Sequence, residues 1–136
     1  MRILLDTQVW LWMLSAPERL SKKTRSRVAS SDNELLLSAA SAWEIAIKHA
    51  LGKLQLPEPP EEYIPSLMNR TGMTPLPVLH RHALRVAALP AHHRDPFDRL
   101  LIAQAQLEQA PVLTADKAFR LYDVEIIIAD GPLTRP

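Results

Sequence analysis

Short apolar runs alternate along this chain with longer segments whose apolar residues recur at helical spacing. Residues 2–6 hold a continuous apolar run that ends in an acid, the pattern of a strand covered on both faces. Further strands are predicted at residues 35–37, 73–76, 112–114 and 124–128. The chain therefore predicts a sheet that is buried between two layers.

Helices are predicted between these strands. Ser21 is placed to cap the basic helix that follows it, and Gly52 closes a helix that begins near Ser41. Pro96 suits the first position of a helix that extends to Glu108. Helical spacing also covers residues 9–14, 61–69 (despite Pro65) and 79–89. Strands that alternate with helices predict an α/β fold of three layers, with a mostly parallel central sheet flanked by helices.

The length of 136 residues fits one domain. The proline-rich stretch at residues 56–60 is too short to divide two domains, so we predict a single domain over residues 1–136. Sixteen Lys and Arg residues against fifteen Asp and Glu give a net charge of +1, which argues neither for nor against a polyanionic partner. The absence of cysteine excludes disulfides and thiolate metal sites.

The N-terminal residues resemble a signal peptide only superficially. Asp6 interrupts the apolar run, and no small-residue cleavage site follows it. No stretch approaches the roughly 18 uninterrupted apolar residues of a membrane span. The predicted location is therefore the cytoplasm.

Acidic residues stand where the predicted strands give way to helices. Asp6 ends the first run, Glu44 follows the second, Asp95 and Asp98 open the helix at Pro96, and Asp116 follows the run at residues 112–114. If these runs are neighbouring parallel strands, the acids converge on the edge where open α/β sheets bind ligands. Clustered carboxylates repel one another and attract a hard divalent cation. The pattern therefore points to metal-assisted phosphodiester chemistry.

Each acid also has a simpler explanation, because acids favour helix N-termini. Residues 41–44 fit a capping box, Asp95 is placed as a cap, and Asp6 and Asp116 are placed to cap the helices after them. Taken singly, capping is the better explanation for every one. Capping does not predict acids at four junctions of one sheet edge, however, since Ser or Thr would serve equally well.

Four segments together resemble the PIN domain: LLDTQVWLW at residues 4–12, SAASAWEIAIK at 38–48, HRDPFDRLLIAQA at 93–105 and LTAD at 113–116. They cover nearly the whole chain in the right order. Within that fold the chain is most similar to the toxin ribonucleases of bacterial VapBC toxin–antitoxin pairs. The combination is highly specific, although no single segment is.

The resemblance implies an endoribonuclease that depends on Mg²⁺ or Mn²⁺. Asp6, Glu44 and Asp116 match three of the family's acids. Asp98 suits the remaining one better than Asp95, because the family's acid usually precedes an apolar helix start followed by Ala, as in DRLLIA at residues 98–103. Asp95 is then a cap or a supporting acid. Gln8 departs from close relatives, which often carry His there, and this puts substrate handling in doubt more than catalysis.

The predicted catalytic set is Asp6, Glu44, Asp98 and Asp116, with Asp6, Asp98 and Asp116 as metal ligands. Glu44 is expected to orient the attacking water. Thr7 and Thr114 are expected to supply hydroxyl contacts beside the acids, although a turn-forming Thr is the commoner reading. Basic residues near the acidic rim are candidate contacts to the RNA backbone, with solvated surface charge as the alternative: Lys48, Lys53, Arg94 and Arg99.

Other candidate residues favour structural roles. His92 and His93 predict a solvated pair, with a role near the phosphate as the second reading, and His49, His80 and His82 predict ordinary surface or helix positions. Packing is predicted for Trp10, Trp12 and Trp43, with partner binding second: Trp10 and Trp12 would help to form a hydrophobic groove for an antitoxin helix. No nucleophile elbow and no phosphate-cradling glycine loop is present.

The main prediction is a toxin ribonuclease that a cognate VapB-like antitoxin neutralises, and the family implies a homodimer. One alternative is a PIN nuclease of RNA processing without an antitoxin. Another is a phosphoacceptor domain, which needs an Asp at the end of a central strand, whereas the second strand here ends in Ser38. A third is a catalytically silent binding module, against which the retained acids argue.

Overall fold

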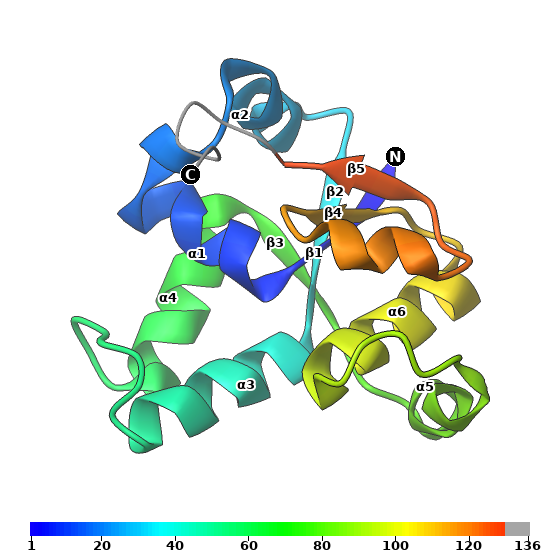
Figure 1. The fold of residues 1–136 in the computed structure, drawn as a ribbon. Coiled ribbons are helices and arrows are strands. Elements are labelled where there is room, and N and C mark those ends of the chain that lie inside the picture. The colour runs from blue at the N-terminus through cyan, green and yellow to red at the C-terminus, as the bar shows by residue number, and fades with distance from the viewer. Residues whose placement is uncertain (130–136) are drawn as a thin grey trace.

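A computed structural model describes residues 1–129 of the chain. Its five strands form one parallel sheet in the order β3-β2-β1-β4-β5 (Figure 1). The strands are β1 (Arg2–Leu5), β2 (Glu34–Ser38), β3 (Met73–Leu76), β4 (Val112–Thr114) and β5 (Ile126–Ile128). Every strand expected from the apolar pattern is confirmed. The predicted single domain extends to residue 136, and residues 130–136 lie outside the described part of the chain.

The α-helices are α1 (Thr7–Ser15), α2 (Lys22–Ala29), α3 (Ala39–Ala50), α4 (Pro60–Thr71), α5 (His80–Arg85) and α6 (Pro96–Glu108). Three 3₁₀ helices join them: η1 (Pro17–Arg19), η2 (Val86–Ala88) and η3 (Lys117–Leu121). The single helix predicted over residues 79–89 is wrong in detail, because it is divided into α5 and η2. Leu89 is extended, with a ψ of 143°, as expected for a residue that precedes a proline.

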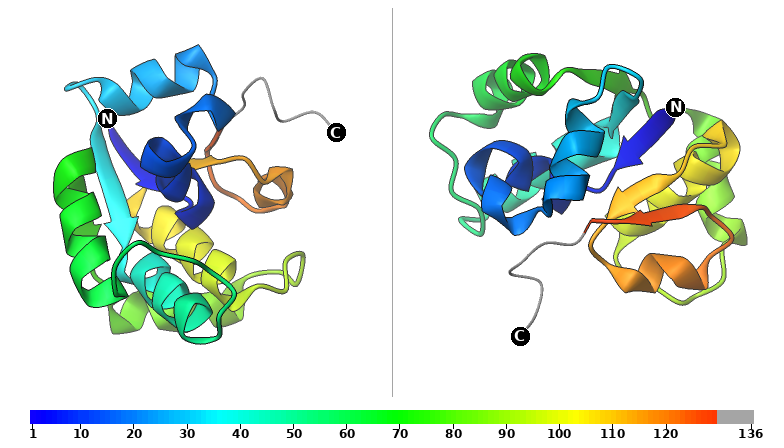
Figure 2. Two further views of the ribbon diagram at one scale, coloured as in Figure 1. Left: turned by 90° about the vertical axis from the view of Figure 1, so that its left-hand side faces the viewer. Right: turned by 90° about the horizontal axis from the view of Figure 1, so that it is seen from above.

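Two hydrophobic layers cover the sheet because successive strand residues point to opposite faces. Ile3 and Leu5 of β1 pack into one layer, with α1, α4 and residues of α2, whereas Leu4 packs into the other, with α6 and η3. Figure 2 shows the helices on the two sides of the sheet. The three-layer α/β architecture is therefore confirmed.

The caps of α3 and α6 fix where two of the acids lie. The hydroxyl of Ser38 accepts a hydrogen bond from the amide of Ala40, so α3 begins at Ala39 rather than near Ser41. The predicted capping box at residues 41–44 is wrong, since Ser41 and Glu44 both lie inside the helix. Asp95 caps α6 as predicted, accepting from the amides of Phe97 and Asp98.

The strand order creates a switch point between β1 and β4. The chain leaves β1 to build β2 and β3 on one side and then crosses to build β4 and β5 on the other. Such a point opens a crevice at the carboxyl ends of the strands, which is where open α/β sheets bind ligands. Asp6 and Asp116 follow the two strands that flank it. Among the helices of residues 1–129, none combines the length and the apolar character needed to cross a bilayer.

Candidate active site

The predicted acids meet at this switch point. Asp6 follows β1, Glu44 lies in α3, Asp98 lies in the first turn of α6 and Asp116 directly precedes η3. The negative charges of Asp6, Glu44 and Asp116 all raise the pKa of Asp98, so the four side chains share one electrostatic environment. The convergence expected from the strand ends is therefore present in the fold.

Asp6 is buried and held by one hydroxyl. Thr114 donates a hydrogen bond of 2.8 Å to Oδ2 of Asp6. Burial raises the pKa of Asp6, the Thr114 hydrogen bond partly offsets this, and the charge of Glu44 raises it further. Asp6 stands at the start of α1 without capping it through its side chain, so capping does not explain its presence.

Asp98 is the most strongly perturbed acid of the cluster. Burial first, and then the charges of Asp6, Asp95, Glu44 and Asp116, raise the pKa of Asp98 to about 8. An acid with this pKa holds its proton near neutral pH unless a cation compensates for the neighbouring charge. The arrangement therefore favours occupation by a metal ion or a proton over four bare carboxylates.

Glu44 presents an oxygen that needs a partner. Its Oε2 accepts a 2.7 Å hydrogen bond from Nζ of Lys48, and this bond is the main reason that the pKa of Lys48 is raised. Its Oε1 is buried without any hydrogen-bond partner among the described residues. A buried carboxylate oxygen left in this way is costly, and a divalent cation or its coordinated water satisfies it. The donor set, made of carboxylate oxygens, thus fits a hard divalent cation.

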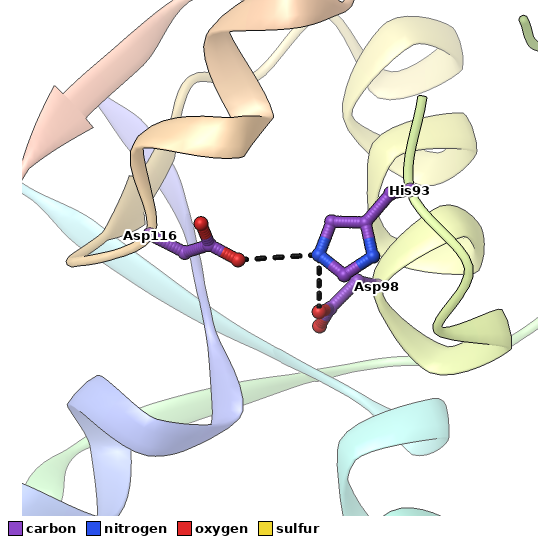
Figure 3. A group of neighbouring side chains, drawn as sticks. All are labelled: His93, Asp98 and Asp116. Carbon is purple, nitrogen blue, oxygen red and sulfur yellow. Dashed lines mark hydrogen bonds and ion pairs between the residues drawn. The ribbon is translucent and has the colours of Figure 1, made fainter. Parts of the chain in front are cut away.

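His93 reaches into the cluster from the loop before α6. Its Nε2 lies 3.0 Å from Oδ2 of Asp98 and 3.1 Å from Oδ2 of Asp116 (Figure 3). The prediction of a solvated pair is therefore wrong for His93, although His92 is exposed. The second reading, a role of His93 near the phosphate, stays a prediction, and the sequence carries no spacing signal that singles this residue out.

The other predicted site residues occupy varied positions. Thr7 donates a 2.7 Å hydrogen bond to Oγ of Ser41, which ties α1 to α3 beside Asp6. Thr114 accepts the amide of Asp116 as well as donating to Asp6, so it links two acids. Asp116 also caps η3, since its Oδ1 accepts from the amide of Ala118.

Of the predicted RNA contacts, Arg99 is occupied within the protein. Its Nη1 and Nη2 donate to the carbonyls of Pro90 and Val86, at 2.9 and 3.0 Å, with longer contacts to neighbouring groups of the same loop. A phosphate would need the same N–H donors. Arg99 therefore holds the segment between η2 and α6 in place instead of facing a ligand. Arg94 and Lys53 are exposed, and Lys48 is bound to Glu44.

Two further expectations need correction. Trp43 is 60% exposed: it makes a T-shaped contact with the Phe97 ring and lines a surface hollow, so it is not part of the buried core. Trp10 is fully buried, and Trp12 packs against the core, as predicted. His82 is fully buried rather than on the surface, since its ring bonds to the amide of Leu79 and to Glu108.

Fold and site together define a three-layer α/β domain whose carboxylates cluster at the switch point of its sheet. The chain belongs to the PIN domain family, whose sequence model matches residues 3–125. The end of the second strand in Ser38 does not argue against a phosphoacceptor domain, because the central strand is β1 and an Asp, Asp6, follows it. The family match excludes that alternative instead.

Two curated relatives come from Mycobacterium tuberculosis. Ribonuclease VapC16 is 55% identical over 60 residues, which are 44% of this chain and 43% of that protein, so the match spans less than half of its length. Ribonuclease VapC22 is 30% identical over 122 residues, 87% of this chain and 89% of that protein. In fold, the chain is similar to one in the structure of VapBC2 from Rickettsia felis bound to a promoter DNA fragment. That match has a TM-score of 0.74 at 14% identity, and it covers 96% of this chain and 100% of the other.

Proposed function

We propose that this protein is a metal-dependent endoribonuclease that acts as the toxin of a toxin–antitoxin pair. The observation that carries the proposal is the buried carboxylate cluster at the switch point, in which Oε1 of Glu44 has no partner among the described residues and the pKa values of Asp6 and Asp98 are raised. The names of the relatives, Ribonuclease VapC16 and VapC22, support the same activity.

The cation is proposed to be Mg²⁺ or Mn²⁺, because these ions prefer oxygen ligands. Asp6 and Asp98 would hold it directly, and Glu44 would orient water through its free oxygen. Asp116 would hold it as well, because each of its oxygens keeps a lone pair beyond the hydrogen bonds from Ala118 and His93. When bound, the cation lowers the pKa of water and neutralises charge on the phosphate oxygens.

RNA is proposed to approach over the rim formed by α3 and the loop before α6. Lys48 lies beside Glu44 with half of its side chain exposed, and Arg94 is exposed on that loop. Their charges would meet the phosphates on either side of the scissile bond. Arg99 is left out of this interface because its guanidinium holds the loop.

The partner is proposed to be a VapB-like antitoxin, as in the VapBC assemblies named among the structural neighbours. A hollow between α1, α2 and α4 is lined by Met13, Leu14 and Val28, with Arg25 and Arg70 also on its wall. An antitoxin segment with apolar and acidic side chains fits this hollow. Trp10 does not contribute, because it is fully buried.

A homodimer and a cytoplasmic location complete the proposal. Trp43 and Phe97 line an apolar hollow with Val86 and Leu100, and a second copy of the chain is proposed to cover it. A Trp43→Lys variant would then sediment as a monomer under conditions in which the unchanged protein sediments as a dimer. Identical sedimentation of the two proteins would remove this surface from the proposal.

Purified protein should be tested on a mixed RNA pool with Mg²⁺ or Mn²⁺, with EDTA, and as the Asp6→Asn variant. Fragments that require metal and disappear with the variant are expected. No cleavage by folded, metal-loaded protein across varied RNAs would contradict the proposed activity. Cleavage that the product of an adjacent small gene does not inhibit would favour an RNA-processing nuclease over a toxin.

A further inference from the structure

We propose that His93 is a positioning residue of the metal site, which orients Asp98 and Asp116 without binding the cation. Its Nε2 lies between one oxygen of each carboxylate, at 3.0 and 3.1 Å (Figure 3). The carboxylate oxygens of Asp98 and Asp116 that face the ring lie within 4.8 Å of each other. Charged carboxylates this close repel each other, and a shared N–H donor reduces that repulsion while fixing both side chains. This inference rests on the proposed metal-dependent function.

The hydrogen bonds of the ring determine which nitrogen carries the proton. The amide N–H of Asp95 points at Nδ1 of His93 from 3.2 Å, so Nδ1 must accept. In the neutral ring the other nitrogen is then the donor, and Nε2–H faces the two carboxylates. A nitrogen that carries a proton offers no lone pair to a metal. His93 therefore fits a donor to the carboxylates and does not fit a ligand of the cation.

The loop that carries His93 is held at several points. The hydroxyl of Tyr122 accepts the amides of His92 and His93, at 3.1 and 2.7 Å, and Arg99 donates to the carbonyl of Pro90. The edge of the His93 ring also meets Phe119, with centroids 6.0 Å apart. A ring fixed in this way can impose an orientation on its partners, as a mobile surface histidine cannot.

The same arrangement recurs at the other acids of the cluster. Thr114 donates to Oδ2 of Asp6, Lys48 donates to Oε2 of Glu44, and His93 donates to Oδ2 of Asp98. Asp6, Glu44 and Asp98 thus each have one oxygen bound by a protein donor, which restricts the orientation of the carboxylate. Donors of this kind orient metal ligands, and their loss typically costs about 10- to 100-fold in metal affinity.

The test measures Mn²⁺ binding by electron paramagnetic resonance in the unchanged protein and in three variants. His93→Phe removes the donor but keeps a ring, and it is expected to weaken binding by about 10- to 100-fold. His93→Gln places an amide nitrogen the same number of bonds from Cα as Nε2, and it is expected to bind nearly as well as the unchanged protein. His92→Phe alters the exposed neighbour and is expected to leave binding unchanged.

A spectroscopic measurement separates a donor from a ligand even if a variant fails to fold. Electron spin echo envelope modulation of the Mn²⁺-loaded unchanged protein is expected to give no signal from a directly coordinated ¹⁴N nucleus. Such a signal would overturn the inference, and so would equal affinity in folded His93→Phe. Failure of the unchanged protein to bind Mn²⁺ would instead contradict the proposed metal dependence.

Discussion

The hydroxyl of Thr114 joins two acids that are 108 and two positions away from it in the chain. It donates to Oδ2 of Asp6 at 2.8 Å and accepts the amide of Asp116 at 3.0 Å. These bonds cross the switch point between β1 and β4, where Thr114 is fully buried. The central strand and its neighbour are therefore linked at the place where the proposed chemistry occurs.

Replacing Thr114 with Val keeps the shape of the side chain and removes both hydrogen bonds. The free energy of unfolding should fall by about 1–3 kcal/mol, since a buried carboxylate loses its donor. Metal-dependent RNA cleavage should fall by about 10- to 100-fold, because Asp6 is no longer oriented. Denaturant unfolding and cleavage assays measure the two effects. Thr74→Val on β3 is the matched control: its hydroxyl makes only a long, 3.4 Å surface contact with Glu34, so stability should change little and cleavage not at all.

Replacing Asp98 with Asn should stabilise the metal-free protein near neutral pH. The pKa of Asp98 is raised to about 8, so the folded state retains a proton that the unfolded state releases at a much lower pH. The stability of the unchanged protein therefore falls as pH rises toward 8, and the variant escapes this loss. In EDTA at about pH 7.5 the variant should be more stable by on the order of 1–3 kcal/mol.

Added Mg²⁺ should reverse that order. It should raise the melting temperature of the unchanged protein and have little effect on Asp98→Asn, which lacks the ligand charge. Melting curves from about pH 5 to 8, with EDTA or with Mg²⁺, measure this dependence. Asp123→Asn changes an exposed acid and serves as the control. A metal-free stability that does not depend on pH over this range would contradict the raised pKa.

Replacing Arg99 with Lys should destabilise the protein rather than weaken only its contact with RNA. A single ammonium group cannot satisfy the carbonyls of Val86 and Pro90 together, as the two guanidinium nitrogens do. The expected loss is about 1–3 kcal/mol in the free energy of unfolding. Arg85→Lys, the same substitution at an exposed position, is the control. Unchanged stability with a higher KM for RNA would return Arg99 to the RNA interface.

Replacing Glu108 with Gln should lower stability at neutral pH but not in acid. The hydrogen bond from His82, and the nearby Arg81, lower the pKa of Glu108. A lowered pKa in the folded state gives stability that is present above the usual glutamate pKa and is lost as pH falls through the folded value. The melting temperatures of the two proteins should therefore differ at pH 7 and converge below about pH 4. A difference that persists in acid would argue against the charge as its cause.

Much of the fold could be predicted from local patterns. The bounds of α6 and β4 agree with the prediction, because Pro96 begins the helix and an apolar run defines the strand. The cap of α3 was misplaced, since Ser38 and Ser41 are both suitable caps and only the register of the helix on the sheet selects Ser38. The apolar neighbours of Trp43 in the sequence predict packing, but its side chain is 60% exposed in the folded chain.

The acids of the site could be predicted for the same local reason. A parallel strand that enters a helix places its last residue at the carboxyl edge, so Asp6 and Asp116 were expected there together. Their electrostatic coupling with Asp98 and Glu44 agrees with that expectation. The position of His93 could not be predicted, because its contacts come from Asp98, Asp116 and Tyr122, and the sequence spacing around His93 implies none of them.

The sequence alone determined the helices and strands, their alternation and the acids at their ends. The spacing of apolar residues, helix capping and the geometry of proline all act within a few residues of the chain. The tertiary structure alone decided that β1 is central, that His93 lies between two carboxylates and that Arg99 holds a loop instead of facing solvent. Such contacts join residues from separate elements. They depend on strand order and helix packing, which are properties of the whole folded chain and leave no periodic signal in the sequence.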